Sequence, residues 1–395
     1  MKLANCCISI ADGDHQPPPK SETGIPFVTI ANIQNNQFDF TNSMFVPVSY
    51  YEKLDEKRKA HKDDVLYSVV GSFGIPVLIK TELPFVFQRH IAILRPSKKI
   101  DSRFLYYTML SRDFYMKADA AAIGAAQRTI SLTALRNIEI NVPPIETQRR
   151  IADILSAYDD LIENNRKQIK LLEESAQRLY KEWFVDLRFP GHEHTRIVDG
   201  IPEGWKIRAV SDFGKVVTGK TPSTSKSEYY DGNIPFVTIP DMHNTIFPLS
   251  TEKHLSEQGA NTQKSKFIPP NSVMVSCIAT VGLVSITSQQ CQTNQQINSV
   301  VLKSQLDLYF LYFAMKRIKS LLDGVGSNGA TMTNVNKMKF ENINILYPES
   351  HLINCFFEFS MPVFRKILIL SKENLQLQQV RDRLLPKLMS GEVKT

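Results

Sequence analysis

The sequence predicts an α+β protein: two tandem domains of mixed α/β structure, separated by two long helices that pair as an antiparallel coiled coil with pseudo-twofold symmetry. Three observations lead to this fold class. The six residues IPFVTI occur twice, at positions 25–30 and 234–239. Short β-branched and aromatic runs, bounded by Gly, Pro, Asn and Asp, fill both halves of the chain. A heptad-like apolar pattern follows each half.

The length and composition are those of an ordinary globular protein with more than one domain. The chain has 395 residues, whereas a typical domain has roughly 100 to 200. No apolar run approaches the roughly 18 residues of a membrane span, and we expect a cytoplasmic protein with no membrane partner. The five cysteines show no CxxC spacing, which argues against a zinc ribbon. A net charge of +7 is compatible with a nucleic-acid partner without requiring one.

The repeat extends over the whole chain. Residues 63–79, DDVLYSVVGSFGIPVLI, align with residues 271–287, NSVMVSCIATVGLVSIT, and residues 124–143 align with 329–348. The separation between copies falls only from 209 (234 minus 25) to 205 (329 minus 124). The chain is therefore a tandem duplication. We place the boundaries at 1–144 and 196–348 for the two domains, and at 145–195 and 349–395 for two helical spacer regions.

Within each domain, short strands and one long helix are expected. PFVTI, DVLYSVV, HIAIL, SVMVSCI and NSVVL have the composition of strands, and residues 101–118 and 306–322 have the apolar periodicity of helices. The first domain lacks the aromatic-rich opening EGWKI of the second, so its opening strand is expected to be short or altered.

Each spacer region carries an apolar seam with alternating spacings of three and four residues. Each seam either packs on its own domain or pairs with the other seam, and the shared register favours pairing. We expect about 25 helical residues in each, a rod of roughly 38 Å. Pro386 is expected to kink or end the second helix about a turn early, and Pro362 to make its start irregular. The seam positions are Asn165, Ile169, Leu172, Ala176, Leu179 and Trp183, and then Leu370, Asn374, Leu377, Arg381, Leu384 and Leu388.

Sequence signals for an enzyme are lacking. There is no GxGxxG after a strand and no P-loop. NVPPI at 141–145 only superficially matches the Asn-Pro-Pro-aromatic motif of amino-methyltransferases, since Val142 intervenes and Ile145 is not aromatic. The HEH at 192–194 lies in a Pro-Gly linker without a distant third ligand, so we expect no metal there.

Three stretches resemble the DNA-specificity (S) subunit of Type I restriction-modification systems, and the resemblance covers essentially the full chain. They are VPPIETQRRIADILSAYDDLIENNRKQIKLLEESAQRLYKEWFVD at 142–186, IPEGWKI at 201–207 and GKTPSTSKSEYYDGNIPFVTI at 219–239. The order of parts, domain, helix, domain, helix, is more specific than any single motif.

The resemblance implies a non-catalytic subunit. Each globular half would be a target-recognition domain that reads one half of a bipartite site in double-stranded DNA, and the helices would set the spacing between the halves. Two copies of a methyltransferase (M) subunit would dock on it, and restriction/translocase (R) subunits would join through the complex. S-adenosylmethionine, ATP and Mg would belong to those partners, with no cofactor bound by this chain. A coiled-coil structural adaptor and a stand-alone DNA-binding regulator remain alternatives.

Three polar loops recur at equivalent places in both domains and are the candidate DNA-binding segments. Arg and Lys suit guanine or phosphate, and Asn and Gln suit adenine. The side chains of these loops differ between the copies while the scaffold repeats, as two readers of different half-sites would require. The candidates are Lys20, Gln88, Arg89, His90, Gln127, Arg128 and Thr129 in the first domain, and Lys220, Thr221, Ser223, Lys226, Gln295, Gln296, Asn298, Thr331, Thr333, Asn334 and Lys337 in the second.

Overall fold

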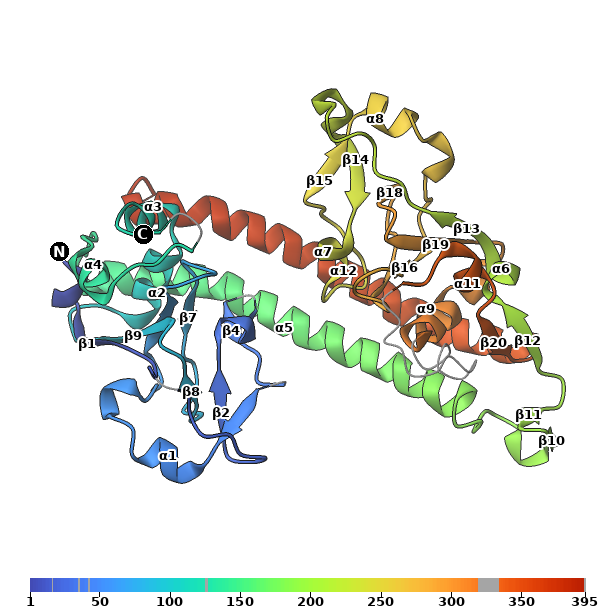
Figure 1. The fold of residues 1–395 in the computed structure, drawn as a ribbon, viewed down its shortest axis with the longest axis horizontal. Coiled ribbons are helices and arrows are strands. Elements are labelled where there is room, and N and C mark those ends of the chain that lie inside the picture. The colour runs from blue at the N-terminus through green and yellow to red at the C-terminus, as the bar shows by residue number, and fades with distance from the viewer. Residues whose placement is uncertain (16, 35, 42, 125–126, 319–333, 394–395) are drawn as a thin grey trace. The chain divides into compact units, whose positions relative to one another are not determined.

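The computed structural model describes residues 1–15, 17–34, 36–41, 43–124, 127–318 and 334–393 (Figure 1). The chain forms two units. Unit 1 comprises Met1–Ile162 and Gln376–Thr395, and unit 2 comprises Glu163–Leu375. The long helices α5 (Ile145–Phe184) and α12 (Ser350–Ser390) each contribute one end to unit 1 and the other end to unit 2.

Unit 1 is built on a four-stranded antiparallel sheet. In spatial order its strands are β1 (Cys7–Asp12), β9 (Ile91–Pro96), β6 (Val65–Ser68) and β7 (Pro76–Leu78). Alternate residues of the central strands face opposite sides, because successive side chains of a strand point to opposite faces. Val65 and Leu94 pack in one hydrophobic core with the helices, whereas Leu66 and Ile93 pack in a second core on the other face. Both faces are covered, which explains the uninterrupted apolar runs.

Helices cover one face of this sheet and a second sheet lies on the other. The helices are α2 (Ser102–Leu110), α3 (Arg112–Ala120) and α4 (Leu132–Asn137). The second sheet has the order β5 (Met44–Val46), β2 (Ile25–Val28) and β8 (Val86–Phe87), with β2 and β8 parallel. A hairpin of β3 (Ile33–Gln34) and β4 (Gln37–Phe38) and helix α1 (Val48–Glu52) complete the part of the unit that precedes β6.

Unit 2 repeats this architecture. Its main sheet has the same order, β13 (Gly214–Thr218), β19 (Ile297–Leu302), β16 (Val273–Ser276) and β17 (Val284–Ile286). Its second sheet is β15 (Lys253–Leu255), β14 (Tyr230–Val237) and β18 (Gln292–Thr293), again with one parallel pair. Two short pairs are β10 (Ile197–Val198) with β11 (Ile201–Pro202) and β12 (Lys206–Ala209) with β20 (Asn344–Tyr347). The helices are α6 (Val210–Phe213), α7 (Ile239–Met242), α8 (Glu257–Asn261), α9 (Leu308–Lys316) and α11 (Lys337–Glu341).

The two IPFVTI segments occupy the same place in the two units. The IPFV residues of each copy lie in the central strand of the second sheet, β2 or β14, and the threonine that follows caps a helical turn. The amide of Thr29 donates to Asn32 Oδ1 at 2.9 Å, and the amide of Thr238 donates to Asp241 Oδ2 at 2.7 Å. The prediction of a duplicated α+β fold is therefore confirmed, and the two copies also agree in sheet order and in these caps.

The long helices contact each other in both units, in antiparallel orientation. In unit 1, Leu155 near the start of α5 shares a core with Leu388 near the end of α12. In unit 2, Tyr180, Trp183 and Phe184 near the end of α5 place their rings 5.2 to 6.4 Å from that of Phe356 near the start of α12. The same side chains also pack on the domain cores, so pairing and domain packing share one interface.

Three details of the sequence prediction were wrong. The helices have 40 and 41 residues rather than about 25, because the segments nearest the domains bury an apolar face in the cores and so stay helical. Helix α12 runs through Pro362 and Pro386, since one lost backbone hydrogen bond is offset by buried leucines and phenylalanines on both sides. Residues 101–118 form two helices, because the Ser111 hydroxyl accepts from the Phe114 amide and starts a new helix.

The opening strand of unit 1 is short, as expected. A single bridge joins Lys2 to Glu139, whereas the equivalent pair in unit 2 spans four residues, Lys206–Ala209 with Asn344–Tyr347.

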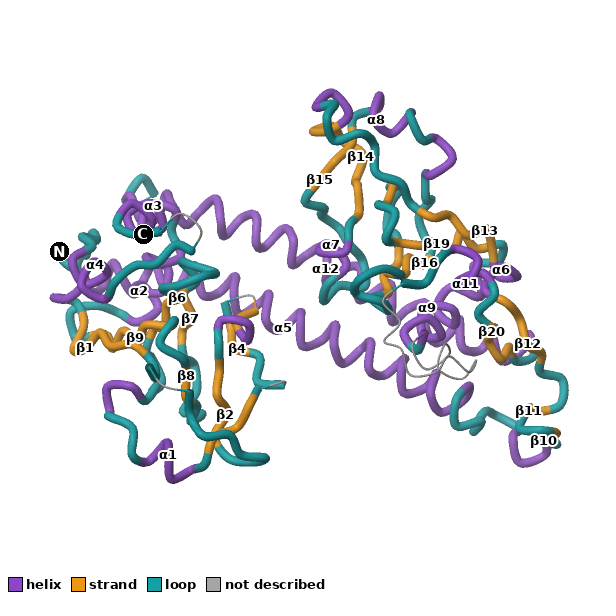
Figure 2. The backbone as a smooth tube through the Cα atoms, in the orientation of Figure 1, coloured by secondary structure: helices purple, strands orange, loops and turns teal. Residues whose placement is uncertain are grey.

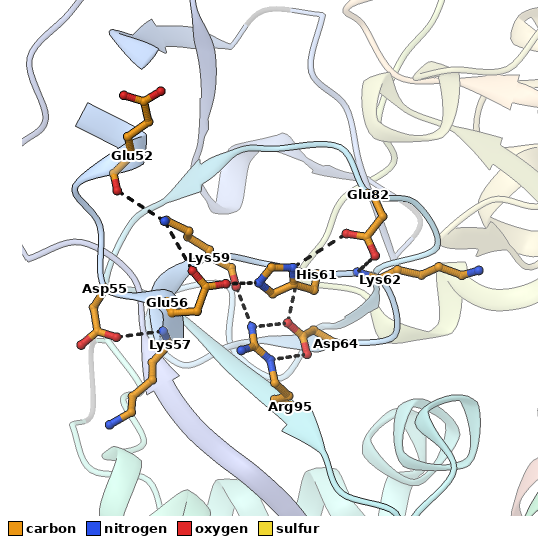
Figure 3. A network of polar contacts seen from close by, with 10 residues as sticks. All are labelled: Glu52, Asp55, Glu56, Lys57, Lys59, His61, Lys62, Asp64, Glu82 and Arg95. Carbon is orange, nitrogen blue, oxygen red and sulfur yellow. Dashed lines mark hydrogen bonds and ion pairs between the residues drawn. The ribbon is translucent and has the colours of Figure 1, made fainter. Parts of the chain in front are cut away.

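A polar network holds the connection between α1 and β6 (Figure 3). The Arg95 guanidinium donates to both Asp64 oxygens at 3.2 and 3.0 Å and to the Lys59 carbonyl at 2.8 Å. The Asp64 side chain is 3% exposed and also accepts from the His61 amide at 2.9 Å. His61 contacts Glu56 at 2.6 Å. This network fixes the start of the central strand β6, whose other end leads into a surface loop.

Candidate nucleic-acid interface

In unit 2, the loop that follows β13 lies against the loop that precedes β19. The amide of Lys220 donates to the carbonyl of Thr293 at 2.9 Å, and the hydroxyl of Thr221 donates to Gln295 Oε1 at 2.6 Å. The two loops are therefore joined by one hydrogen bond between backbone groups and by one between side chains. The first two candidate loops form one continuous surface.

The third candidate loop of unit 2 reaches the same edge of the sheet. The amide of Cys277, just after β16, donates to the carbonyl of Gln296 at 2.8 Å, and the amide of Val335 donates to the carbonyl of Cys277 at 2.7 Å. Strands β13 and β16 both run antiparallel to β19. Their ends therefore meet the start of β19 at one edge, where all three loops converge. Figure 2 shows the loops of each unit in teal between the orange strands.

The same contacts recur in unit 1. The amide of Asp14 donates to the carbonyl of Phe87 at 2.9 Å, the amide of Val69 to that of His90 at 2.9 Å, and the amide of Ile130 to that of Val69 at 3.0 Å. Asp14 therefore occupies the position that Lys220 occupies in unit 2. The two units present equivalent edges with different side chains.

Three lysines are exposed around the edge of unit 2, namely Lys220, Lys226 and Lys337. The Lys226 ammonium donates to the Tyr229 hydroxyl at 3.1 Å and lies 5.1 Å from the centroid of its ring, and this hydrogen bond raises the pKa of Lys226. The Lys337 ammonium lies 3.3 Å from Glu341 on the next helical turn. All three place a positive charge at the surface of this edge.

The neutral candidates of unit 2 divide into outward and inward groups. Ser223, Gln295 and Asn334 are exposed. Asn298 is 2% exposed, and its oxygen accepts from the Thr218 hydroxyl at 2.6 Å. The prediction of a DNA contact at Asn298 therefore does not fit, because this side chain offers no free group at the surface and instead orders the sheet edge.

Gln296 is half-buried, and its oxygen accepts from Asn294 Nδ2 at 2.9 Å. Thr331 and Thr333, the remaining candidates of this unit, lie outside the described residues.

In unit 1, Lys20, Arg89 and Gln127 are exposed, and Gln88, His90 and Thr129 are half-buried. The Arg128 guanidinium is already engaged within the unit, since it donates to the Asp119 carboxylate at 2.8 and 2.6 Å and to the Asp119 carbonyl at 2.6 Å. With its side chain 40% exposed, Arg128 presents one face outward while it closes the end of α3. Arg89 is the more available cation.

The third loop of each unit also starts a helix. The Ser131 hydroxyl accepts from the Ala134 amide at 3.1 Å, and Asn336 Oδ1 accepts from the Lys339 amide at 2.9 Å. These are ordinary N-caps. They fix where each loop ends, and the residue directly before each cap, Ile130 or Val335, is buried.

A fourth loop at the same edge was missed by the sequence reasoning. It follows β6 in unit 1 and β16 in unit 2. The Ser68 hydroxyl accepts from the Ile75 amide at 2.8 Å, and the Ser276 hydroxyl accepts from the Leu283 amide at 2.8 Å, so both turns are closed in the same way. The amide of Gly71 in this turn donates to the carbonyl of Arg128 at 3.4 Å. The repeated Ser and Gly of the aligned segments were the available signal.

The residues of the two seams lie on the inner faces of α5 and α12. Ala176 and Leu388 are buried, and Ile169, Leu172, Leu179, Trp183 and Leu384 are half-buried against the cores. Leu377 is half-buried. Asn374 is 8% exposed, as is Asn165 at 5%. Arg381 Nη1 lies 2.5 Å from Asp159 Oδ1 on α5.

Within the described residues, no group of three or more His, Cys, Asp or Glu side chains is arranged to hold a metal ion. No helix of the described residues is both long and apolar enough to cross a membrane.

The chain is similar to known proteins of one family. The family model of the Type I restriction modification DNA specificity domain matches it twice, at residues 14–174 and 202–352. The Type I restriction enzyme HindI specificity subunit of Haemophilus influenzae is 31% identical over 93% of this chain and 94% of its own length. The MjaIX specificity subunit of Methanocaldococcus jannaschii is 27% identical over 76% of this chain and 71% of its own. The crystal structure of the S subunit from M. genitalium matches with a TM-score of 0.58 at 16% identity, over 98% of this chain and 95% of that one, and so supports the fold.

Proposed function

The chain belongs to the family of Type I restriction-modification DNA specificity subunits, and from this we propose that each unit reads one half of a bipartite DNA sequence. The observation that carries the proposal is the loop-bearing sheet edge. It is built twice with the same backbone hydrogen bonds and with different outward side chains. A shared scaffold with divergent loops is what two readers of different half-sites need.

The exposed side chains suit two kinds of contact. Arg89, Lys20, Lys220 and Lys226 carry positive charge and would bind phosphates, or guanine where a major-groove edge is in reach. Gln127, Gln295 and Asn334 are amides that can both donate and accept, which matches the edge of adenine. Loops held by backbone hydrogen bonds lose little conformational freedom on binding, which favours selective contacts.

The helices α5 and α12 would set the distance between the half-sites. At 1.5 Å per residue, helices of 40 and 41 residues are each about 60 Å long. We propose that their paired surfaces also dock two copies of a methyltransferase subunit, since a duplicated chain offers the same kind of docking surface twice. Restriction subunits would join through the complex. We expect this chain to supply recognition only, with S-adenosylmethionine, ATP and Mg bound by the partners.

A charge-reversal experiment separates DNA reading from a purely structural adaptor role. Arg89→Glu and Lys226→Glu should each weaken binding of the specificity–methyltransferase complex to its DNA site. The neutral variant Arg89→Ala should lower the slope of log binding constant against log salt by roughly 1, as expected for one lost phosphate contact. Glu22→Lys, at an exposed acidic position of the same unit, is the opposite-charge control. If the chain were only an adaptor, every variant would bind DNA as the wild-type complex does and with the same salt dependence. That result would reject the proposal.

A further inference from the structure

The backbone that leads into the first loop of unit 2 lies close against the neighbouring backbone. The amide of Gly219 donates to the carbonyl of Ile297 at 3.1 Å. A Cβ atom on Gly219 would lie 2.1 Å from the carbonyl oxygen of Asn294 and 2.3 Å from that of Thr293. Such distances are impossible without a backbone shift, so only glycine fits. The path of the chain up to Lys220 is therefore fixed.

The carbonyl of Lys220 is fixed separately, by a buried glutamine. Gln263 Nε2 donates both of its hydrogens, one to the Lys220 carbonyl at 2.7 Å and one to Gln292 Oε1 at 2.7 Å. Gln292 Nε2 in turn donates to the carbonyl of Ala260 at 3.0 Å. Gln263 is 5% exposed and Gln292 is fully buried. A chain of amides therefore connects the end of α8 and strand β18 to the exposed loop.

The direction of this chain is dictated by its ends. The carbonyls of Ala260 and Lys220 can only accept hydrogen bonds. Gln292 must therefore turn its nitrogen toward Ala260, which leaves its oxygen facing Gln263, and Gln263 must present its nitrogen to both acceptors. Either amide turned over would set two oxygens against each other, so the network has a single arrangement.

Unit 1 has no glutamine at the equivalent strand position. Phe27 pairs with Val86 in β8, as Phe236 pairs with Gln292 in β18. The carbonyl of Asp14, the counterpart of Lys220, accepts from the backbone amide of Arg89 at 2.9 Å. The Asp14 carboxylate accepts from the hydroxyl of Tyr50. The group that holds this carbonyl thus differs between the units, a backbone amide in unit 1 and a glutamine side chain in unit 2, whereas the order of the main sheet is shared. Because the two units share a scaffold and are proposed to read different half-sites, a difference in the group that holds this loop is a candidate determinant of the sequence that each unit reads.

We propose that Gln263 and Gln292 are positioning residues for DNA recognition. By holding the Lys220 carbonyl they determine how the side chains of Lys220 and Thr221 meet the half-site read by unit 2. The inference rests on the proposed function and adds specificity residues that touch no DNA themselves. It also accounts for the buried amide of Gln292 at a strand position where unit 1 has Val86.

The test is base-resolution methylation mapping in cells that carry the chain with its methyltransferase subunits. Gln263→Met keeps the length and apolar volume of the side chain and removes both donated hydrogen bonds. We expect discrimination at one or more base positions of the unit 2 half-site to fall about ten-fold, in the range of a single mismatch. The half-site read by unit 1 should be unchanged, which serves as an internal control for folding and assembly.

Two further variants separate positioning from general stability. In Gln263→Met the buried oxygen of Gln292 loses its hydrogen-bond donor. The double variant Gln263→Met with Gln292→Met removes this unpaired oxygen, so it should be more stable than Gln263→Met and still show the relaxed half-site. Gln258→Leu, at an exposed position of α8, is the matched control and should keep the wild-type motif. If Gln263→Met fails to fold, the double variant carries the test. Hydrogen exchange of residues 218–226 should be faster in either variant than in the wild type.

The outcomes distinguish the two proposals. If the wild-type chain directs no split motif, the proposed function fails before any variant is made. If the wild-type motif is split and the folded Gln263→Met and double variants both keep the unit 2 half-site unchanged, the positioning role is rejected and the proposed function stands. Equal loss of both half-sites in the folded double variant would likewise reject positioning, since it would show a defect of the whole complex.

Discussion

Replacing Arg381 by methionine should destabilise the pairing of α5 and α12 within unit 1. Arg381 Nη1 lies 2.5 Å from Asp159 Oδ1, and each side chain is 19% exposed. Asp159 Oδ2 also accepts from the Tyr107 hydroxyl at 2.7 Å. Burial alone would lower the pKa of Arg381, but the hydrogen bonds and charges of Asp159 and, less strongly, of Asp382 outweigh it and raise that pKa above its ordinary value. The guanidinium therefore stays charged throughout the accessible pH range.

The expected cost follows from the burial of the pair. Removing one partner of a fully buried ion pair costs roughly 3 to 5 kcal/mol, because the other charge is left without compensation. Here the side chains are one-fifth exposed, and Asp159 keeps its bond from Tyr107. We therefore expect the free energy of unfolding of unit 1 to fall by about 2 kcal/mol. For a unit of about 180 residues this lowers Tm by roughly 4 to 8 °C.

A double-mutant cycle with Arg381→Met and Asp159→Asn, followed by thermal unfolding, measures this coupling directly. The coupling energy should be about 1 to 2 kcal/mol. Arg383→Met, exposed on the same turn of α12, is the control and should change stability by less than about 0.5 kcal/mol. A coupling energy near zero, or an Arg381→Met variant as stable as Arg383→Met, would refute the reasoning.

Three other predictions concern buried groups. Replacing both Asn165 and Asn374 by leucine should raise Tm by several degrees, because each buries one amide atom that has no hydrogen-bond partner among the described residues; a lower Tm in calorimetry would contradict this. Gly13→Ala and Gly219→Ala should each perturb only their own half-site in methylation mapping, since each Cβ would lie 2.1 Å from a backbone oxygen; an effect shared by both half-sites would argue against separate readers. Burial raises the pKa of Asp307, so the folded state holds this proton more tightly and the associated stability is lost as pH rises from about 4 through the raised pKa. The Tm of Asp307→Asn relative to that of the wild type should therefore be higher at pH 7 than at pH 4. The same Tm difference at both pH values would contradict this prediction.

The architecture could be predicted from the sequence because the chain is a tandem duplication, so each copy supports the assignment made for the other. Two copies of IPFVTI and two seams in one register constrain the strands, the caps and the helix pairing together. Pro386 was misjudged, because the local cost of proline is visible in the sequence, whereas the packing of Leu384 and Leu388 that outweighs it is tertiary.

The candidate site was predicted less completely, since residue type does not reveal burial or partners. Arg89 and Lys226 were recognised as cations on loops, and they are exposed. Asn298 carries an amide of the kind that can read adenine, but it pairs with Thr218 across two strands, and its side chain is bonded to the Thr218 hydroxyl. Gln263 gave no signal, because its role depends on the approach of a distant loop.

The most direct test of the account is methylation mapping of cells in which residues 1–144 or 196–348 are exchanged for those of a specificity subunit with a different motif. Both helical regions and the methyltransferase subunits are kept. The account predicts a split motif in which only one half changes with each exchange, and in which the spacing between the halves stays constant. A motif that changes in both halves at once, or a wild-type chain whose removal alters no methylated sequence, would contradict it.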